Sequence, residues 1–206
     1  MPCYHPLKGY KGRVISETTG KRPVVFNSRD GYSDMPVSVP CGRCIGCRID
    51  RSRQWAVRCV HEASLYERNC FITLTFDDNH LPPGGSLVKK DFQLFMKRLR
   101  QFACRNVWVP VLGEYVELPR KYWIRGGVGI RYFHCGEYGE QLGRPHHHAC
   151  IFNFNFADRY LWKERDGVRL YRSKALESLW SDGKGCESYG YCTIAFTSYK
   201  VSCGRT

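Results

Sequence analysis

The chain has 206 residues, of which 43% are hydrophobic, so it can form one globular domain with a small appended module. No apolar run reaches membrane-spanning length and the N-terminus lacks a secretory signal pattern, so we expect a cytoplasmic protein without a membrane partner. Lys and Arg number 32 against 19 Asp and Glu, a net charge of +13. This charge indicates a polyanionic partner, most economically nucleic acid, with a generally basic soluble protein as the alternative. The many aromatic residues favour single-stranded nucleic acid, which proteins bind through phosphate contacts and base stacking.

Residues 1–40 are rich in Gly, Pro, Ser and charge, and predict irregular structure with one short strand at 23–26. The segment Cys41-Gly-Arg-Cys44-Ile-Gly-Cys47 follows. Twelve Cys in a chain without an export signal argue against a disulfide framework. Three Cys at this spacing, separated by Gly, indicate a metal site rather than core packing.

A closed tetrahedral site needs a fourth ligand, and Cys3 can supply it if the chain folds back. Cys59 and His61 are the alternatives. We expect zinc rather than an iron–sulfur cluster, because a redox role needs partners that the sequence does not show.

Residues 48–67 predict an amphipathic helix with arginines along it. One interpretation is a basic helix against DNA phosphates; the other is a solvated helix whose arginines do nothing specific. The candidate contacts here are Arg48, Arg51, Arg53 and Arg58.

Residues 70–76 are apolar and β-branched, and predict a central strand. A loop follows, and residues 89–104 predict a helix whose aromatic side chains form core. Lys97 and Arg98 lie on its other side as further candidate DNA contacts. Residues 105–129 carry two β-like pieces, 108–112 and 122–124, around a polar segment, which indicates an inserted hairpin.

Residues 130–139 predict a strand that turns into a second strand beginning at Pro145. Because side chains alternate along a strand, His146 and His148 share one face and His147 points the other way. The hairpin brings Glu137 near both imidazoles. Two imidazoles and a carboxylate suit Mg²⁺ or Mn²⁺ with positions open for a phosphate, whereas ordinary polar histidines on a solvated face are the alternative.

Residues 153–171 are predicted to be loop-like. A short helix, capped by Ser173, should cover 173–180. The last predicted strand covers 191–196.

Three blocks of this sequence resemble replication initiators of the HUH endonuclease superfamily, in particular those of the gokushovirus branch of the microviruses, which are small single-stranded DNA phages. The first is Phe71-Ile-Thr-Leu-Thr-Phe76. The second is Gly136-Glu-Tyr-Gly139 with Gly143-Arg-Pro-His-His-His-Ala149. The third is the Cys-rich segment with the Arg51-Ser-Arg-Gln-Trp-Ala-Val-Arg58 stretch after it.

The resemblance implies an α+β fold: a central antiparallel sheet with flanking helices, related to RNA-recognition-like folds. It implies a Cys-rich N-terminal segment with a basic helix at 1–67 and an endonuclease domain at 68–206. Arg144, beside the histidines, joins the candidate DNA contacts. The implied setting is the cytoplasm of a bacterial host, with the replication origin as DNA partner and host helicase and polymerase as further partners.

The resemblance also implies a reaction, in which a tyrosine hydroxyl attacks an origin phosphodiester and forms a 5′-phosphotyrosine link. His146, His148 and Glu137 would hold the metal. Tyr199 is near the family's position for the nucleophile, but Lys200 is adjacent rather than a turn away, and the chain ends where family members continue. A truncated product, a degraded copy and a divergent end all fit, and Tyr189 and Tyr191 are the fallback nucleophiles.

Two other functions compete with this one. The first is a non-catalytic nucleic-acid-binding relic that keeps the zinc site. The second is a transposase or plasmid relaxase of the same superfamily, which would use the same site in another biological role.

Overall fold

The structure is a computed structural model that describes residues 3–165, 167–182 and 188–195. The chain forms two compact units, Met1–Val60 and His61–Thr206. The boundary between them falls within helix α1 (Ile45–Ser64). A domain boundary at residues 67 and 68 remains a prediction. Among the described residues, no helix is both long and apolar enough to cross a membrane.

The N-terminal unit contains a small antiparallel sheet in the order β2-β1-β3. Its strands are β1 (Leu7–Gly12), β2 (Val24–Val25) and β3 (Gly31–Val39). The short strand near Val24 was predicted, but the irregular structure expected around it is wrong. Residues of β1 and β3 are mostly exposed and polar, so they lack the apolar alternation by which a strand is recognised in a sequence.

Helix α1 begins three residues earlier than predicted, so that Cys47 lies in its first turn. Most of its residues before Cys59 are exposed, including Trp55. A helix is therefore confirmed, ending at Ser64 rather than at residue 67, but its predicted apolar stripe is exposed at Ile49 and Ala56. Its arginines are exposed to solvent.

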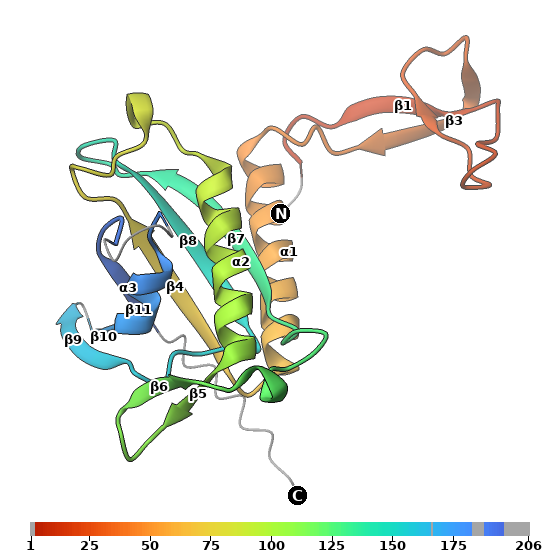
Figure 1. Cartoon of the computed structure of the whole chain (residues 1–206). Coiled ribbons are helices and arrows are strands. Elements are labelled where there is room, and N and C mark those ends of the chain that lie inside the picture. Colours follow the sequence, from red (N-terminus) through yellow and green to blue (C-terminus); the bar gives the residue numbers. More distant parts are fainter. Residues whose placement is uncertain (1–2, 166, 183–187, 196–206) are drawn as a thin grey trace, which may run out of the picture. The chain divides into compact units, whose positions relative to one another are not determined.

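The second unit is built on a six-stranded sheet in the order β7-β8-β4-β11-β10-β9, with antiparallel neighbours throughout (Figure 1). Its strands are β4 (Asn69–Thr75), β7 (Arg131–Tyr138), β8 (Pro145–Phe152), β9 (Tyr160–Arg165), β10 (Val168–Arg172) and β11 (Cys192–Ala195). The predicted α+β class and the central place of β4 are confirmed.

Two helices, α2 (Lys89–Arg105) and α3 (Lys174–Leu179), cross the same face of this sheet (Figure 1). Alternate β4 residues, such as Ile72 and Leu74, enter the core, and α2 contributes Phe92 and Phe95. Trp180, just after α3, is fully buried. Burial of each of these side chains contributes about 1.5–3 kcal/mol. The opposite face of the sheet carries the candidate site.

Helix α3 begins at the predicted cap. The Oγ of Ser173 accepts a hydrogen bond from the backbone N–H of Leu176 at 3.0 Å and donates one to Asp158 at 2.6 Å. Both bonds satisfy buried polar groups at the first turn of a short helix. The carboxylate of Asp158 therefore ties α3 to the chain before β9.

The loop predicted for residues 153–171 is confirmed only for 153–159, because β9 and β10 pair as a hairpin in the rest of the segment. Gly167 has a φ of 75° at its turn, a conformation that glycine adopts without steric cost. The register shifts between Leu170 and Tyr171, which breaks the alternation that would have marked the strands.

The inserted hairpin exists, but its second strand was misplaced. Strand β5 (Asn106–Val109) pairs with β6 (Glu114–Glu117), which lies in the segment taken as polar. The second predicted strand, at 122–124, does not form, because Tyr122 ends a 3-10 turn, η2 (Arg120–Tyr122), and the next two residues lie in no strand. The Trp108 and Tyr115 rings pack at 5.2 Å and hold the pairing. A further 3-10 turn, η1 (Pro83–Gly85), precedes α2.

Candidate metal centre

The β7–β8 hairpin sets the geometry of the candidate site. Its register pairs Glu137 with His146. On the other side of β8, the pairing with β4 places Thr73 opposite His148. Because strand side chains alternate, His146 and His148 share one face of the sheet with Glu137. The sequence prediction of this face is confirmed.

The three side chains converge. The Oε2 of Glu137 lies 3.4 Å from Nε2 of His148 and 3.8 Å from Nε2 of His146. The donor atoms of the three all lie within 4.8 Å of one another. Glu137 is 61% exposed and the imidazoles about one-fifth exposed, so solvent and a substrate can reach this group.

Both imidazoles present Nε2 because Nδ1 has another partner. Nδ1 of His146 lies 3.1 Å from the carbonyl oxygen of Arg144, which only accepts, so Nδ1 carries the proton and Nε2 a lone pair. Nδ1 of His148 lies 3.0 Å from the Thr73 hydroxyl, which can orient its ring in the same way. Burial, and then the neighbouring His146, lower the pKa of His148. A neutral imidazole is the form that binds a metal.

The middle histidine has a different role. His147 is buried among Phe76, Phe92 and Trp180, and its Nδ1 lies 3.0 Å from Nε2 of His134. Burial lowers the pKa of His147 to about 4. His147 is thus a neutral core residue on the opposite side of β8 from the donors.

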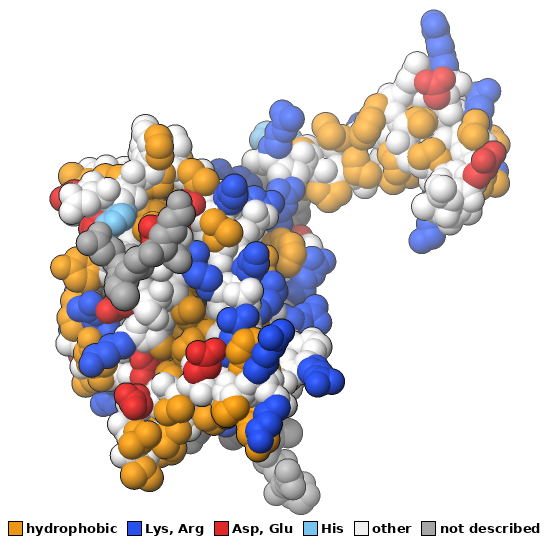
Figure 2. Space-filling view, viewed as in Figure 1, with side chains coloured by type: hydrophobic (Ala, Val, Ile, Leu, Met, Phe, Trp, Pro, Cys, Tyr) orange, Lys and Arg blue, Asp and Glu red, His pale blue; other side chains and the backbone are white. Residues whose placement is uncertain are grey.

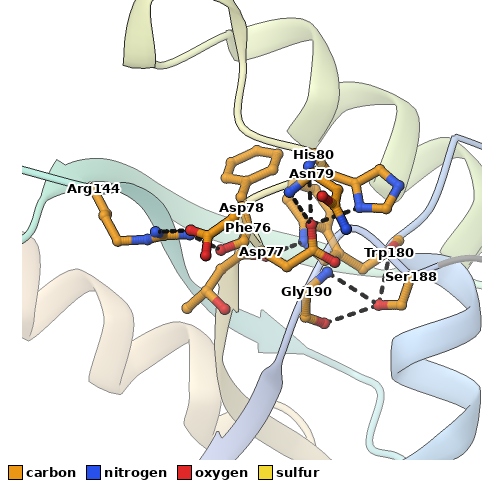
Figure 3. Close-up of polar contacts among 10 residues, drawn as sticks. Phe76, Asp77, Asp78, Asn79, His80, Arg144, Trp180, Ser188 and Gly190 are labelled. Carbon is orange, nitrogen blue, oxygen red and sulfur yellow. Dashed lines mark hydrogen bonds and ion pairs between the residues drawn. The ribbon is translucent and has the colours of Figure 1, made fainter.

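A pocket of about 550 Å³ adjoins His146. Its walls come from the end of β4, the β7–β8 turn and the residue before β11: Thr75, Phe76, Asp77, Asp78, Gly139, Arg144, Pro145, His146 and Tyr191. The Arg144 guanidinium bonds the carboxylate of Asp78 and the carbonyl oxygen of Phe76 (Figure 3). Sequence reasoning did not single out the two aspartates.

Asp77 organises the turn beside this pocket (Figure 3). Its Oδ1 accepts hydrogen bonds from the backbone N–H of Asn79 at 3.0 Å and of His80 at 2.9 Å, and lies 2.7 Å from Nδ1 of His80. Partial burial acts to raise the pKa of Asp77, but hydrogen bonds and the charge of His80 outweigh it and the pKa is lowered. A stable carboxylate therefore fixes the chain leaving β4.

The proposed nucleophile, Tyr199, lies outside the described residues, as does Lys200. Of the two fallback tyrosines, Tyr189 packs against Phe76 and Trp180, and burial raises its pKa. Tyr191 is 63% exposed and shares the pocket with His146. Exposure and position make Tyr191 the better placed of these two.

The N-terminal unit holds a second group of donors. The sulfurs of Cys3, Cys41, Cys44 and Cys47 all lie within 4.8 Å of one another, which confirms Cys3 as the fourth member rather than Cys59 or His61. The Cys3 and Cys44 sulfurs are 3.8 Å apart, too far for a disulfide. A tetrahedral zinc with Zn–S bonds of about 2.3 Å separates its sulfurs by about 3.8 Å, so the group fits zinc.

The electrostatics of this group also suit a metal. Backbone N–H groups of Cys47 and Tyr4 lower the pKa of Cys44 to about 6, whereas desolvation raises the pKa of Cys47 to about 12. One thiolate is therefore available at neutral pH, and a bound cation would favour loss of the remaining protons.

The candidate DNA contacts differ in their surroundings. Those on α1 are all exposed: Arg48, Arg51, Arg53 and Arg58. Lys and Arg side chains also gather over α2, where Lys97 is exposed (Figure 2). Arg98 is different, because its Nε donates to the carbonyl oxygen of Leu179 at 2.8 Å and ties α2 to α3.

These features define a protein with a large antiparallel sheet, a His-x-His strand with a facing carboxylate, and an exposed basic surface. Residues 69–201, more than half of the chain, match the family described as replication-associated protein ORF2/G2P. The chain belongs to this family.

Three phage proteins are similar to the chain. The replication-associated protein VP4 of Bdellovibrio phage phiMH2K is 32% identical over 202 residues, covering 97% of this chain and 56% of that protein. The replication-associated protein ORF2 of Spiroplasma virus 4 is 34% identical over 170 residues, covering 79% of this chain and 46% of that protein. The replication-associated protein ORF4 of Chlamydia phage 1 is 31% identical over 164 residues, covering 75% of this chain and 36% of that protein. The chain therefore spans about half or less of the length of these relatives. No solved structure matches it.

Proposed function

We propose that this protein initiates phage DNA replication by nicking single-stranded DNA at the origin, as an HUH endonuclease does. The observation that carries the proposal is the convergence of Glu137, His146 and His148 on an accessible face of the sheet. Membership of the replication-associated family and the net charge of +13 support it independently.

Glu137 Oε2 and the Nε2 atoms of His146 and His148 would hold Mg²⁺ or Mn²⁺. When bound, such an ion supplies Lewis-acid polarisation of a phosphodiester oxygen. The residues around the site orient the ligands. Thr73 and the Arg144 carbonyl oxygen fix the ring orientations, and partial burial lowers the pKa of His148, which favours its neutral form.

In the proposed reaction, the oxygen of a tyrosine side chain attacks phosphorus and loses its proton. A bond forms between that oxygen and the 5′-phosphate, while the bond from phosphorus to the 3′-oxygen breaks. The 3′-oxygen takes up a proton and leaves as a hydroxyl that can prime synthesis. The covalent link conserves the phosphodiester energy for later rejoining.

Tyr199 is the proposed nucleophile, and Tyr191 is the alternative because it lines the pocket beside His146. The test is to incubate the full chain with labelled single-stranded origin DNA and Mn²⁺, and to look for a covalent protein–DNA band on a denaturing gel. We expect Tyr199→Phe to abolish the band and Tyr191→Phe to retain it. The opposite pattern would move the nucleophile to Tyr191.

The four cysteines of the N-terminal unit are proposed to hold a structural zinc. The spacing of the sulfurs supports zinc over a disulfide pair. Elemental analysis of protein purified without added metal should find zinc in stoichiometric amount. Iron in its place would point to the iron–sulfur alternative.

A binding protein without catalysis is the second candidate function, favoured by the exposed arginines of α1, which need no metal to bind DNA. It predicts salt-dependent binding of single-stranded DNA with no covalent band under any metal. A transposase or relaxase would cleave element ends or a plasmid transfer origin, and not the phage origin, so mapping the cleavage products separates these roles.

A further inference from the structure

The pocket beside His146 has walls that suit a nucleobase better than a phosphate. Two carboxylates, those of Asp77 and Asp78, line it with one guanidinium, that of Arg144. Asp78 pairs with Arg144, and Asp77 pairs with His80. The Arg144 guanidinium is thus already matched by a carboxylate and attracts an anionic phosphate only weakly, whereas a neutral base can offer both a donor and an acceptor to this pair.

We infer that this pocket binds one nucleobase of the single-stranded substrate, and that Arg144 and Asp78 select guanine. The inference rests on the proposed function, because it takes single-stranded DNA as the ligand. Since His146 lines both the pocket and the metal group, the bound base would belong to a nucleotide next to the reacting phosphate.

We infer guanine from the hydrogen-bonding groups that Asp78 and Arg144 still leave open to a ligand. The Asp78 side chain is 86% exposed, so most of its lone pairs are open to a ligand. Both terminal nitrogens of Arg144 already make a hydrogen bond, to Asp78 and to the Phe76 carbonyl. Together, the Asp78 carboxylate and the Arg144 guanidinium suit a base that presents two donors beside one acceptor. Guanine has that edge, with N1–H and N2–H₂ for the carboxylate and O6 for the guanidinium.

Tyr191 supplies a flat wall. Its carbonyl oxygen accepts hydrogen bonds from the Thr75 hydroxyl at 2.7 Å and the Thr75 N–H at 3.2 Å, which fixes the residue at the end of β4. The Arg172 guanidinium lies 5.2 Å from the ring centroid and is held by Glu177. The ring therefore contacts Arg172 and is still 63% exposed, as a base-stacking platform requires.

Glycine at position 190 makes this arrangement possible. A Cβ atom there would lie 2.6 Å from the Thr75 carbonyl oxygen and 2.8 Å from the Asp77 nitrogen. The chain can approach the end of β4 this closely only without a side chain, and the approach places Tyr191 at the pocket.

The test uses the full chain without added Mg²⁺ or Mn²⁺, so that binding is measured apart from cleavage. A random-sequence pool of single-stranded DNA is bound, and the retained molecules are sequenced. We expect guanine to be enriched at one fixed position by about 10- to 100-fold. Arg144→Gln and Asp78→Asn should each remove most of that preference. Arg169→Gln is the matched control, since Arg169 is exposed on β10 and pairs only with Glu164 among the contacts described.

A change in the DNA rather than in the protein keeps the test independent of folding. Inosine in place of guanosine at the selected position removes the N2 amine. This change should weaken the binding of DNA to the unchanged protein and have little effect on the binding of DNA to Asp78→Asn. Tyr191→Phe should keep the preference and Tyr191→Ala should weaken binding.

Several results would overturn the inference. Enrichment of another base, or of none, would do so even if the protein nicks DNA, and the proposed function would then stand alone. If Arg144→Gln weakened the binding of all sequences equally and reduced the salt dependence of binding, Arg144 would be assigned to a phosphate contact instead. Failure of the unchanged protein to bind single-stranded DNA would overturn both the proposed function and this inference.

Discussion

Arg144 and His146 are linked through the backbone: the carbonyl oxygen of Arg144 lies 3.1 Å from Nδ1 of His146, while the Arg144 side chain lines the adjoining pocket. One residue thus orients a candidate metal ligand with its main chain and faces the proposed substrate with its side chain. A substitution of Arg144 should therefore change DNA recognition and leave the orientation of the His146 ring unchanged.

Thr73 should tune metal affinity without binding the metal. Its hydroxyl lies 3.0 Å from Nδ1 of His148, and loss of such a supporting bond typically lowers metal affinity about 10- to 100-fold. We expect Thr73→Val to weaken Mn²⁺ binding by this amount, measured by isothermal titration calorimetry. Thr193→Val is the control, because Thr193 on β11 lies directly opposite Thr73 on β4, so the variant makes the same change one strand further from His148. Equal effects of the two variants would contradict the role of Thr73.

Ser173 should stabilise the fold through the start of α3. Ser173→Ala removes the cap to Leu176 and the hydrogen bond to Asp158, so it should lower the free energy of unfolding by about 1–2 kcal/mol. Urea denaturation measures this change. Ser178→Ala, on the exposed side of the same helix, should change it by less than about 0.5 kcal/mol.

The ionisation of Asp77 should make stability depend on pH. Its pKa in the folded protein lies below the usual 3.8, so its contribution is present above that value and is lost as the pH falls through the folded-state pKa. The unchanged protein should therefore exceed Asp77→Asn in stability at neutral pH, and the difference should shrink below pH 3.8. Asp34→Asn, an exposed carboxylate of β3, controls for the charge change. A difference that grows in acid would contradict the role given to Asp77.

Cys44 should be required for zinc. Cys44→Ser should release the metal from the N-terminal unit and leave Mn²⁺ binding at the His/Glu group unchanged, because the two donor sets share no residue. Cys104→Ser, near the end of α2, is the matched control and should retain zinc. Elemental analysis with Mn²⁺ titration measures both outcomes, and full zinc content in Cys44→Ser would exclude the four-cysteine site.

The site was easier to predict from the sequence than its surroundings. The face shared by His146 and His148 follows from strand alternation alone. The short turn between β7 and β8 makes the two strands neighbours, and so places Glu137 of β7 beside the histidines. Cys3 was found because a closed tetrahedral site needs a fourth thiolate. These are local or chemical constraints, so a single sequence can carry them.

Longer-range relations were not predictable. Asp78 meets Arg144 across 66 residues, and no periodicity links the two. Strands β9 and β10 were missed because their aromatic and charged residues do not alternate and their register is irregular. Strands β1 and β3 were missed because their residues are mostly exposed and polar. The pocket depends on the approach of Asp78 to Arg144 and of Tyr191 to the end of β4, so it emerged only from the folded chain.

The most direct test of the account is metal-dependent nicking by matched variants of β8. Labelled single-stranded origin DNA is incubated with the unchanged protein, His148→Ala or His147→Gln in Mn²⁺, and the cleavage products are resolved. We predict that His148→Ala binds the DNA but does not cut it, while His147→Gln still cuts, because His147 faces the core. Undiminished cutting by His148→Ala would contradict the metal centre on which the proposed function rests.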